Sequence, residues 1–219
     1  MTTKDIDRLG EEMIRSFGCI PNFLNYNGYP ASICVSVNNE VVHGIPSDRR
    51  YIKNGDIVSL DAGLIYKGYH SDAARTHGVG EISDEARKLI DVTKQSFFEG
   101  IKNAKPGKHL VDIARGIQTY AEKNRFSVVR DLVGHGIGTS LHEEPEIPNF
   151  VRLRRGARLQ KGMTLAIEPM INAGTCDVWW MDDDWTVVTR DGGLSAHYEN
   201  TIAITEDGCE ILTMLPEEK

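Results

Sequence analysis

The chain has 219 residues, of which 40% are hydrophobic and 26% are charged. These values are ordinary for a water-soluble globular protein, and the length predicts one domain that buries about 70% of the surface its unfolded chain exposes. Acidic residues outnumber lysine and arginine by 32 to 25, which gives a net charge of −7. This balance argues against a face that binds nucleic acid, because contacts to phosphates require clustered cations.

The sequence also limits the compartment. No apolar run approaches the roughly 18 residues that a membrane span requires, and residues 1–5 lack the apolar core of a signal peptide. The cysteines at positions 19, 34, 176 and 209 show no C-x-x-C spacing. We therefore expect a cytoplasmic protein with no membrane association, no disulfide framework and no cysteine-rich zinc site.

Hydrophobic periodicity predicts three helices. The first has Thr3 as its N-cap and stops at Gly18, and its apolar face comprises Ile6, Leu9, Met13 and Ile14. The second begins at Ser83 and continues to about residue 101, and the third covers about 111–121. Strand-like runs occupy residues 33–37, 56–60, 164–167, 186–189 and 198–204. Strands and helices are segregated, so the predicted fold class is α+β.

Two segments resemble each other. Residues 55–61 and 162–168 both begin with glycine, continue through an apolar strand and end in a carboxylate six residues later. Chance explains such an echo easily, but two related half-domains would explain it as well.

Asp61 and Asp72 flank a reversal of the chain. Gly63 and Gly68 bracket it, and Asp61 follows an apolar run that predicts a buried strand. A hairpin would place the two acids on neighbouring strands, where they would repel each other unless a cation lay between them. The alternative is a turn cap and a surface charge.

His135 lies in the sequence Gly-His-Gly-Ile-Gly, which lacks the G-x-G-x-x-G spacing of a dinucleotide loop. Imidazole is a common metal ligand, although a lone histidine is more often held by backbone groups in a core. Glu168 and Glu199 lie in apolar strand contexts, and each alone would suggest a salt-bridged carboxylate. Two divalent cations would neutralise the four carboxylates together. One histidine among four acids favours manganese, iron(II) or cobalt over a structural zinc.

Two more histidines lie in informative places. His43 precedes a turn at a strand end, and His142 lies seven residues after His135, which is not the H-E-x-x-H spacing. Either could donate a hydrogen bond to a developing oxyanion or to a substrate amide, or could be a solvated loop histidine.

With these motifs the chain resembles the type I methionine aminopeptidases of the pita-bread fold, from about residue 3 to residue 214. The resemblance rests on segments 41–48, 61–76, 134–138, 142–149, 163–169 and 195–201. It implies one catalytic domain over residues 1–219, with a pseudo-two-fold antiparallel sheet and helices on its outer face. It also implies five ligands for two divalent ions per chain (Co, Mn, Fe(II), Zn or Ni), namely Asp61, Asp72, His135, Glu168 and Glu199. Asp72 and Glu199 would bridge the ions.

The resemblance further implies removal of the N-terminal methionine from new polypeptides when the next residue is small. Glu168 would shuttle the proton, His142 would contact the scissile carbonyl and His43 the amide nitrogen. The methionine pocket would comprise Tyr26, Tyr29, Cys34, Leu141 and Trp185. Partners would be the N-termini of nascent polypeptides, with association to the ribosome, and the protein would be a monomer.

Two departures from the family stand out. An N-terminal helical stretch that such enzymes usually carry is expected to be missing, and Leu141 stands where an aromatic residue is common. Two alternatives remain: an aminopeptidase of the same fold that acts on Xaa-Pro peptides, and a catalytically dead relative that binds peptides.

Overall fold

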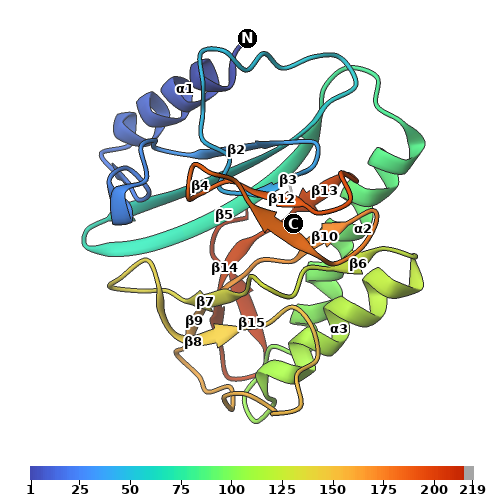
Figure 1. The fold of residues 1–219 in the computed structure, drawn as a ribbon. Helices are drawn as coiled ribbons and strands as arrows, with labels where there is room; N and C mark the ends of the chain where they lie inside the picture. The colour runs from blue at the N-terminus through green and yellow to red at the C-terminus, as the bar shows by residue number, and fades with distance from the viewer. Residues whose placement is uncertain (215–219) are drawn as a thin grey trace.

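The computed structural model describes residues 1–214 and has the α+β architecture that the sequence predicts. Antiparallel sheets form the centre of the molecule, helices α2 and α3 lie side by side along one flank, and α1 lies at the far end (Figure 1). Among the described residues, no helix is both long and apolar enough to cross a membrane.

Helix α1 (Thr3–Ser16) differs from its prediction in two respects. Its N-cap is Thr2 rather than Thr3, and a capping box joins Thr2 and Asp5 through hydrogen bonds of 2.8 and 3.1 Å. Leu9 and Met13, expected on the buried face, are exposed by 53% and 63%. The other two predicted residues are confirmed, because Ile14 is buried and Ile6 packs against the same hydrophobic cluster. The docking face also includes the buried polar residues Thr3 and Asp7, which the hydrophobic pattern did not indicate.

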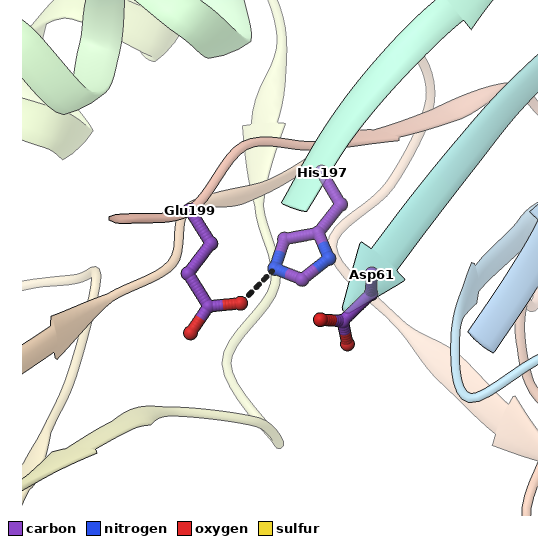
Figure 2. Close-up of side chains that lie close together, drawn as sticks. All are labelled: Asp61, His197 and Glu199. Carbon is purple, nitrogen blue, oxygen red and sulfur yellow. Dashed lines mark ion pairs between the residues drawn. The ribbon is translucent and has the colours of Figure 1, made fainter. Parts of the chain in front are cut away.

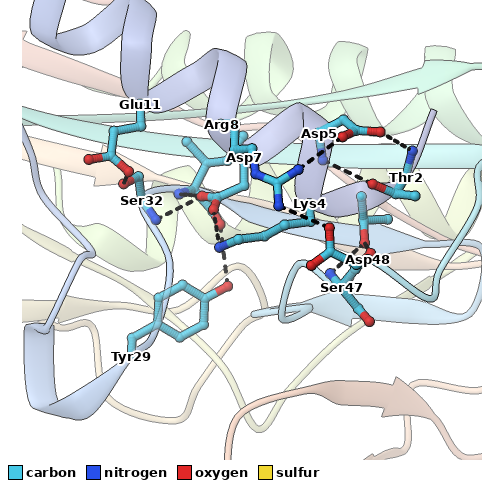
Figure 3. A network of polar contacts seen from close by, with 12 residues as sticks. Thr2, Lys4, Asp5, Asp7, Arg8, Glu11, Tyr29, Ser32, Ser47 and Asp48 are labelled. Carbon is cyan, nitrogen blue, oxygen red and sulfur yellow. Dashed lines mark hydrogen bonds and ion pairs between the residues drawn. The ribbon is translucent and has the colours of Figure 1, made fainter.

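Asp7 supplies the main polar contact of that face. Its Oδ1 accepts hydrogen bonds from the backbone N–H groups of Ser32 and Ile33 at 2.8 and 3.2 Å (Figure 3). The Tyr29 hydroxyl donates to the backbone carbonyl of Gly44 at 3.0 Å. Helix α1 thus fixes the loop at residues 29–33, and Tyr29 of this loop lines the functional pocket described in the next subsection.

A long hairpin forms the first sheet. It consists of β4 (Ile57–Tyr66) and β5 (Tyr69–Gly78), and β4 also pairs with β1 (Ile20–Pro21) and β2 (Cys34–Val37). The turn residues Lys67 and Gly68 have φ values of 50° and 82°, as in the tight turns that match strand twist. The predicted hairpin is therefore confirmed, with longer strands than the sequence suggested.

The second large sheet has five antiparallel strands. In spatial order they are β15 (Cys209–Ile211), β14 (Asn200–Ile204), β9 (Thr164–Ile167), β7 (Gly134–Gly136) and β8 (Glu143–Ile147). Two small sheets complete the centre. One orders β13 (Ser195–His197), β10 (Met170–Asn172) and β6 (Ser127–Val128); the other orders β11 (Val178–Trp180), β12 (Val187–Thr189) and β3 (Glu40–Val42). The two echoed segments of the sequence thus become β4 and β9, one in each large sheet.

Helices α2 (Asp84–Ile101) and α3 (Leu110–Lys123) cover the sheets. Ser83 is the N-cap of α2, as predicted, and its hydroxyl accepts the N–H of Ala86 at 3.1 Å. The core beneath these helices includes Phe97, Ile113 and Ile117, which are fully buried against the five-stranded sheet. This apolar layer supports the strands that carry the polar groups of the functional site.

Candidate metal centre

Four carboxylates and one imidazole converge where the two large sheets meet. They line a single cavity and come from β4, β5, β7 and the segments that follow β9 and β13. The residues are Asp61, Asp72, His135, Glu168 and Glu199. The cavity therefore collects all five side chains that the sequence singled out as candidate metal ligands.

The hairpin register aligns the first two acids. Asp61 pairs with Ala74, and Asp72 pairs with Gly63 two positions along the same strand. Because strand side chains alternate between faces, Asp61 and Asp72 project on the same face as diagonal neighbours. Both are buried, with 8% and 4% exposure.

Backbone hydrogen bonds bring Glu199 to the hairpin. Its N–H donates to the Ala74 carbonyl at 2.9 Å, and the Ala74 N–H donates to the Glu199 carbonyl at 3.3 Å. Thr201 adds a second link, because its hydroxyl donates to the Asp72 carbonyl and accepts the Asp72 N–H, both at 2.9 Å. Glu199 lies between β13 and β14 rather than inside one continuous strand, which corrects the expected strand over 198–204.

The glycines beside His135 permit a close approach of strands. A Cβ on Gly134 would lie 2.3 Å from the carbonyl oxygen of Ala166, and one on Gly136 would lie 2.3 Å from that of Glu144. His135 Nδ1 is 2.8 Å from the carbonyl of Gly136, to which it must donate because a carbonyl only accepts. The Nε2 lone pair is therefore available as a ligand.

Glu168 faces this imidazole. It follows β9 directly, and its Oε1 lies 3.7 Å from His135 Nε2. The backbone carbonyl of Glu168 accepts a hydrogen bond from the Asn149 side chain at 3.0 Å. The strand end is thus fixed while the carboxylate projects into the cavity.

The donor set suits divalent cations. Burial raises the pKa of Asp61 to about 7, and burial together with mutual repulsion raises the pKa values of Asp72, Glu168 and Glu199 well above their ordinary range. Within residues 1–214, Asp61 Oδ1 and Glu199 Oε1 have no hydrogen-bond partner. Ligand-type atoms of Asp72, His135 and Glu199 all lie within 4.8 Å of one another. Oxygen-rich sites with one imidazole bind manganese, iron, cobalt, nickel or zinc.

Two histidines border the same cavity. His142 is exposed at its mouth, and its Nδ1 is hydrogen-bonded to the Tyr26 hydroxyl at 2.7 Å. Its ring centroid lies 4.2 Å from that of His135. His43 follows β3 with φ of 60°, unusual for a residue with a side chain, and burial lowers its pKa to about 4. Both rings therefore present polar edges beside the carboxylates.

The apolar part of the cavity is built by aromatic residues and one thiol. The predicted pocket residues Tyr26, Tyr29, Cys34, Leu141 and Trp185 all line it. Rings of Tyr29 and Trp185 meet edge to face at a centroid distance of 5.1 Å. Phe23, which was not among the predicted pocket residues, packs in the same cluster. The aromatic composition of residues 23–29 was the available signal for it.

His197 is a second residue of the site that no sequence motif indicated. It is 1% exposed, and its ligand-type atoms lie within 4.8 Å of those of Asp61 and Glu199. Figure 2 shows its imidazole between these two carboxylates. Only its position two residues before Glu199 could have indicated it.

Comparisons with known proteins agree with this geometry. The model of metallopeptidase family M24 matches residues 1–206. A methionine aminopeptidase of Clostridium acetobutylicum is 56% identical over 98% of this chain and 86% of its own length. Methionine aminopeptidase 1 of Bacillus subtilis is 53% identical over 97% and 86%.

Solved structures give the same result. The crystal structure of methionine aminopeptidase from Rickettsia prowazekii superposes with a TM-score of 0.95 at 46% identity, over 98% of this chain and 86% of that one. A prolidase from Pyrococcus furiosus, at 22% identity and a TM-score of 0.73, shares the fold over 98% of this chain and 56% of its own. The expected pita-bread fold is thereby confirmed, and the chain belongs to metallopeptidase family M24.

Proposed function

We propose that this protein is a metal-dependent aminopeptidase that removes N-terminal methionine from polypeptides whose next residue is small. The observation that carries the proposal is one cavity with two different parts. One part holds an imidazole and four carboxylates, of which Asp61, Asp72 and Glu199 are buried, and the other part holds aromatic rings and a thiol. The relatives named methionine aminopeptidase support the same assignment.

Five side chains would hold two divalent ions. Asp72 and Glu199 would bridge them, Asp61 would bind one, and His135 with Glu168 would bind the other. The ions, among Co, Mn, Fe(II), Zn and Ni, would supply Lewis acidity and lower the pKa of water. Four carboxylates that repel one another in one cavity support this assignment, because two dications balance their charge.

Glu168 is placed to move protons. Its carboxylate projects into the cavity beside His135, where an acid–base group can reach a bound water and the peptide nitrogen. It would take a proton from the attacking water and deliver it to the leaving amine. The hydrogen bond from Asn149 to its backbone supports this role, because it holds the strand end in place.

The histidines would bind the scissile peptide. The Tyr26 hydroxyl can donate to Nδ1 of His142, which leaves Nε2–H to donate to the carbonyl oxygen as negative charge develops there. His43 would contact the scissile amide nitrogen from the other side of the cavity. Neither role requires a charged imidazole, and burial of His43 favours its neutral form.

The apolar wall would select methionine. Sulfur packs favourably against aromatic edges, and Tyr26, Tyr29 and Trp185 offer such edges beside the Cys34 thiol. One methylene in an apolar pocket changes binding by only about 1–3 kcal/mol, so close analogues of methionine should be cleaved more slowly rather than excluded.

We also propose that the chain acts as a monomeric catalytic domain in the cytoplasm on the N-termini of nascent polypeptides, in association with the ribosome.

The test of the enzymatic proposal is hydrolysis of a Met-Ala-Ser peptide and of an Xaa-Pro peptide with added Mn(II) or Co(II), with and without EDTA. Metal-dependent release of methionine supports the proposal. Cleavage of only the Xaa-Pro peptide contradicts the specificity, and an inert metal-loaded protein contradicts the activity. Glu168→Gln is the matched variant, expected to retain the fold and lose turnover.

A further inference from the structure

His197 occupies an unusual position for a histidine. It ends β13, is only 1% exposed and lies close to the carboxylates of Asp61, Glu168 and Glu199. Among the described residues, neither of its ring nitrogens has a hydrogen-bond partner. A buried imidazole with two unsatisfied nitrogens is costly, so its presence here calls for a group that it contacts in the working protein.

The surrounding carboxylates supply that group. Nε2 of His197 lies 3.8 Å from Glu199 Oε2 and 3.9 Å from Glu168 Oε2. In Figure 2 the dashed line joins its ring to Glu199, and Asp61 lies on the other side of the ring. One nitrogen therefore faces two carboxylates that come from different segments of the chain. A small movement of either would bring it within hydrogen-bond distance.

We propose that His197 is a positioning residue of the metal centre. Its Nε2–H donates to the carboxylates of Glu168 and Glu199 and fixes the direction in which their other oxygens project. This inference rests on the proposed function, because it presumes that these two carboxylates hold metal ions. Carboxylates that ligate a metal are generally held by hydrogen bonds from outside the ligand set, and loss of such a donor weakens metal binding.

The location of His197 supports this role. His197 belongs to β13, whereas Glu168 follows β9, which lies in a different sheet. A hydrogen bond from His197 to both carboxylates would therefore couple the end of β9 to the segment between β13 and β14. The β13 strand itself is fixed through the hydrogen bond between the His197 N–H and the Thr76 hydroxyl at 2.9 Å. A donor on a fixed strand can orient two movable side chains.

The test compares two substitutions of the same residue. Glutamine keeps an N–H donor of similar reach, whereas leucine keeps only the bulk. We expect His197→Leu to weaken Mn(II) binding roughly 10- to 100-fold and His197→Gln to remain within a few-fold of the unsubstituted protein, by titration calorimetry. The matched control is His77→Leu, which changes an exposed histidine of β5 and should leave the affinity unchanged. Circular dichroism of the metal-free variants reports whether they fold.

A second readout separates positioning from direct coordination, because ligand-type atoms of Asp61, His197 and Glu199 lie close enough to hold an ion themselves. Pulsed electron paramagnetic resonance of the Mn(II)-loaded protein with 15N-labelled histidine counts bound imidazoles. We expect one imidazole, and the same signal in His197→Gln. Two imidazoles in the unsubstituted protein, or loss of one in His197→Gln, would make His197 a ligand and overturn the proposal.

Equal Mn(II) affinity in His197→Leu and the unsubstituted protein would also overturn it, while leaving the proposed function intact. Failure of the unsubstituted protein both to bind Mn(II) and to hydrolyse Met-Ala-Ser would instead reject the proposed function, and the positioning role with it. If His197→Leu does not fold, His197→Met replaces it as the variant without an N–H donor, and equal Mn(II) affinity in that variant overturns the proposal.

Discussion

Substitution of Asp61 by asparagine is expected to stabilise the metal-free protein at neutral pH. Burial raises the pKa of Asp61 from 3.8 to about 7, so the folded state holds this proton more tightly than the unfolded state does. The sign follows directly: the folded state binds more protons, so stability falls as the pH rises between about 4 and 7. The difference between the two pKa values corresponds to on the order of 4 kcal/mol at pH 8. Asparagine keeps the shape and removes this penalty.

The assay is urea unfolding in EDTA at several pH values, for the unsubstituted protein and for Asp61→Asn. Carboxylates elsewhere shift the absolute stability with pH, so the difference between the two proteins is the informative quantity. We expect it to be small near pH 4 and to grow to a few kcal/mol in favour of Asp61→Asn by pH 8. Asp207→Asn, at an exposed acid, should show no such trend. A difference that does not change with pH, or a less stable Asp61→Asn at pH 8, would refute the reasoning.

Asp72→Asn should lose most activity and at least one metal ion, and retention of two tightly bound ions in elemental analysis would contradict its bridging role. His142→Ala should lower kcat roughly 100- to 1,000-fold with unchanged metal content; unchanged turnover would show that it is only a loop residue. Trp185→Ala should raise KM and relax selection for methionine, as peptide libraries would report, and an intact preference would remove it from the pocket. Gly134→Ala should destabilise the protein by about 1–3 kcal/mol in urea unfolding, because its Cβ meets a backbone carbonyl at 2.3 Å, whereas Gly208→Ala, with open space, should not.

The hairpin of Asp61 and Asp72 was predictable because its determinants are local. An apolar run and a turn with Gly68 at positive φ define the pairing, and the alternation of strand side chains then places both acids on one face. The helix at Ser83 was predictable for the same reason, since the cap and the first acidic turn lie next to each other in the sequence.

The features that the sequence misassigned depend on tertiary contacts. Leu9 and Met13 follow helical periodicity but are exposed, because α1 docks through Ile14 and through the hydrogen bonds of Asp7 to the backbone of a loop. The break before β14 at Glu199 arises where backbone hydrogen bonds to the hairpin end one strand and start another. His197 carried no local signal, because its importance comes from two carboxylates that only the fold brings within 4 Å.

The most direct test of the account is the number and place of metal ions in the loaded protein. Elemental analysis together with anomalous diffraction from Mn(II)-loaded crystals should find two ions per chain, held by Asp61, Asp72, His135, Glu168 and Glu199. A loaded protein that is active on Met-Ala-Ser with its carboxylates free of metal, or with ions bound elsewhere, would contradict the claim that cations balance this buried acidic cluster.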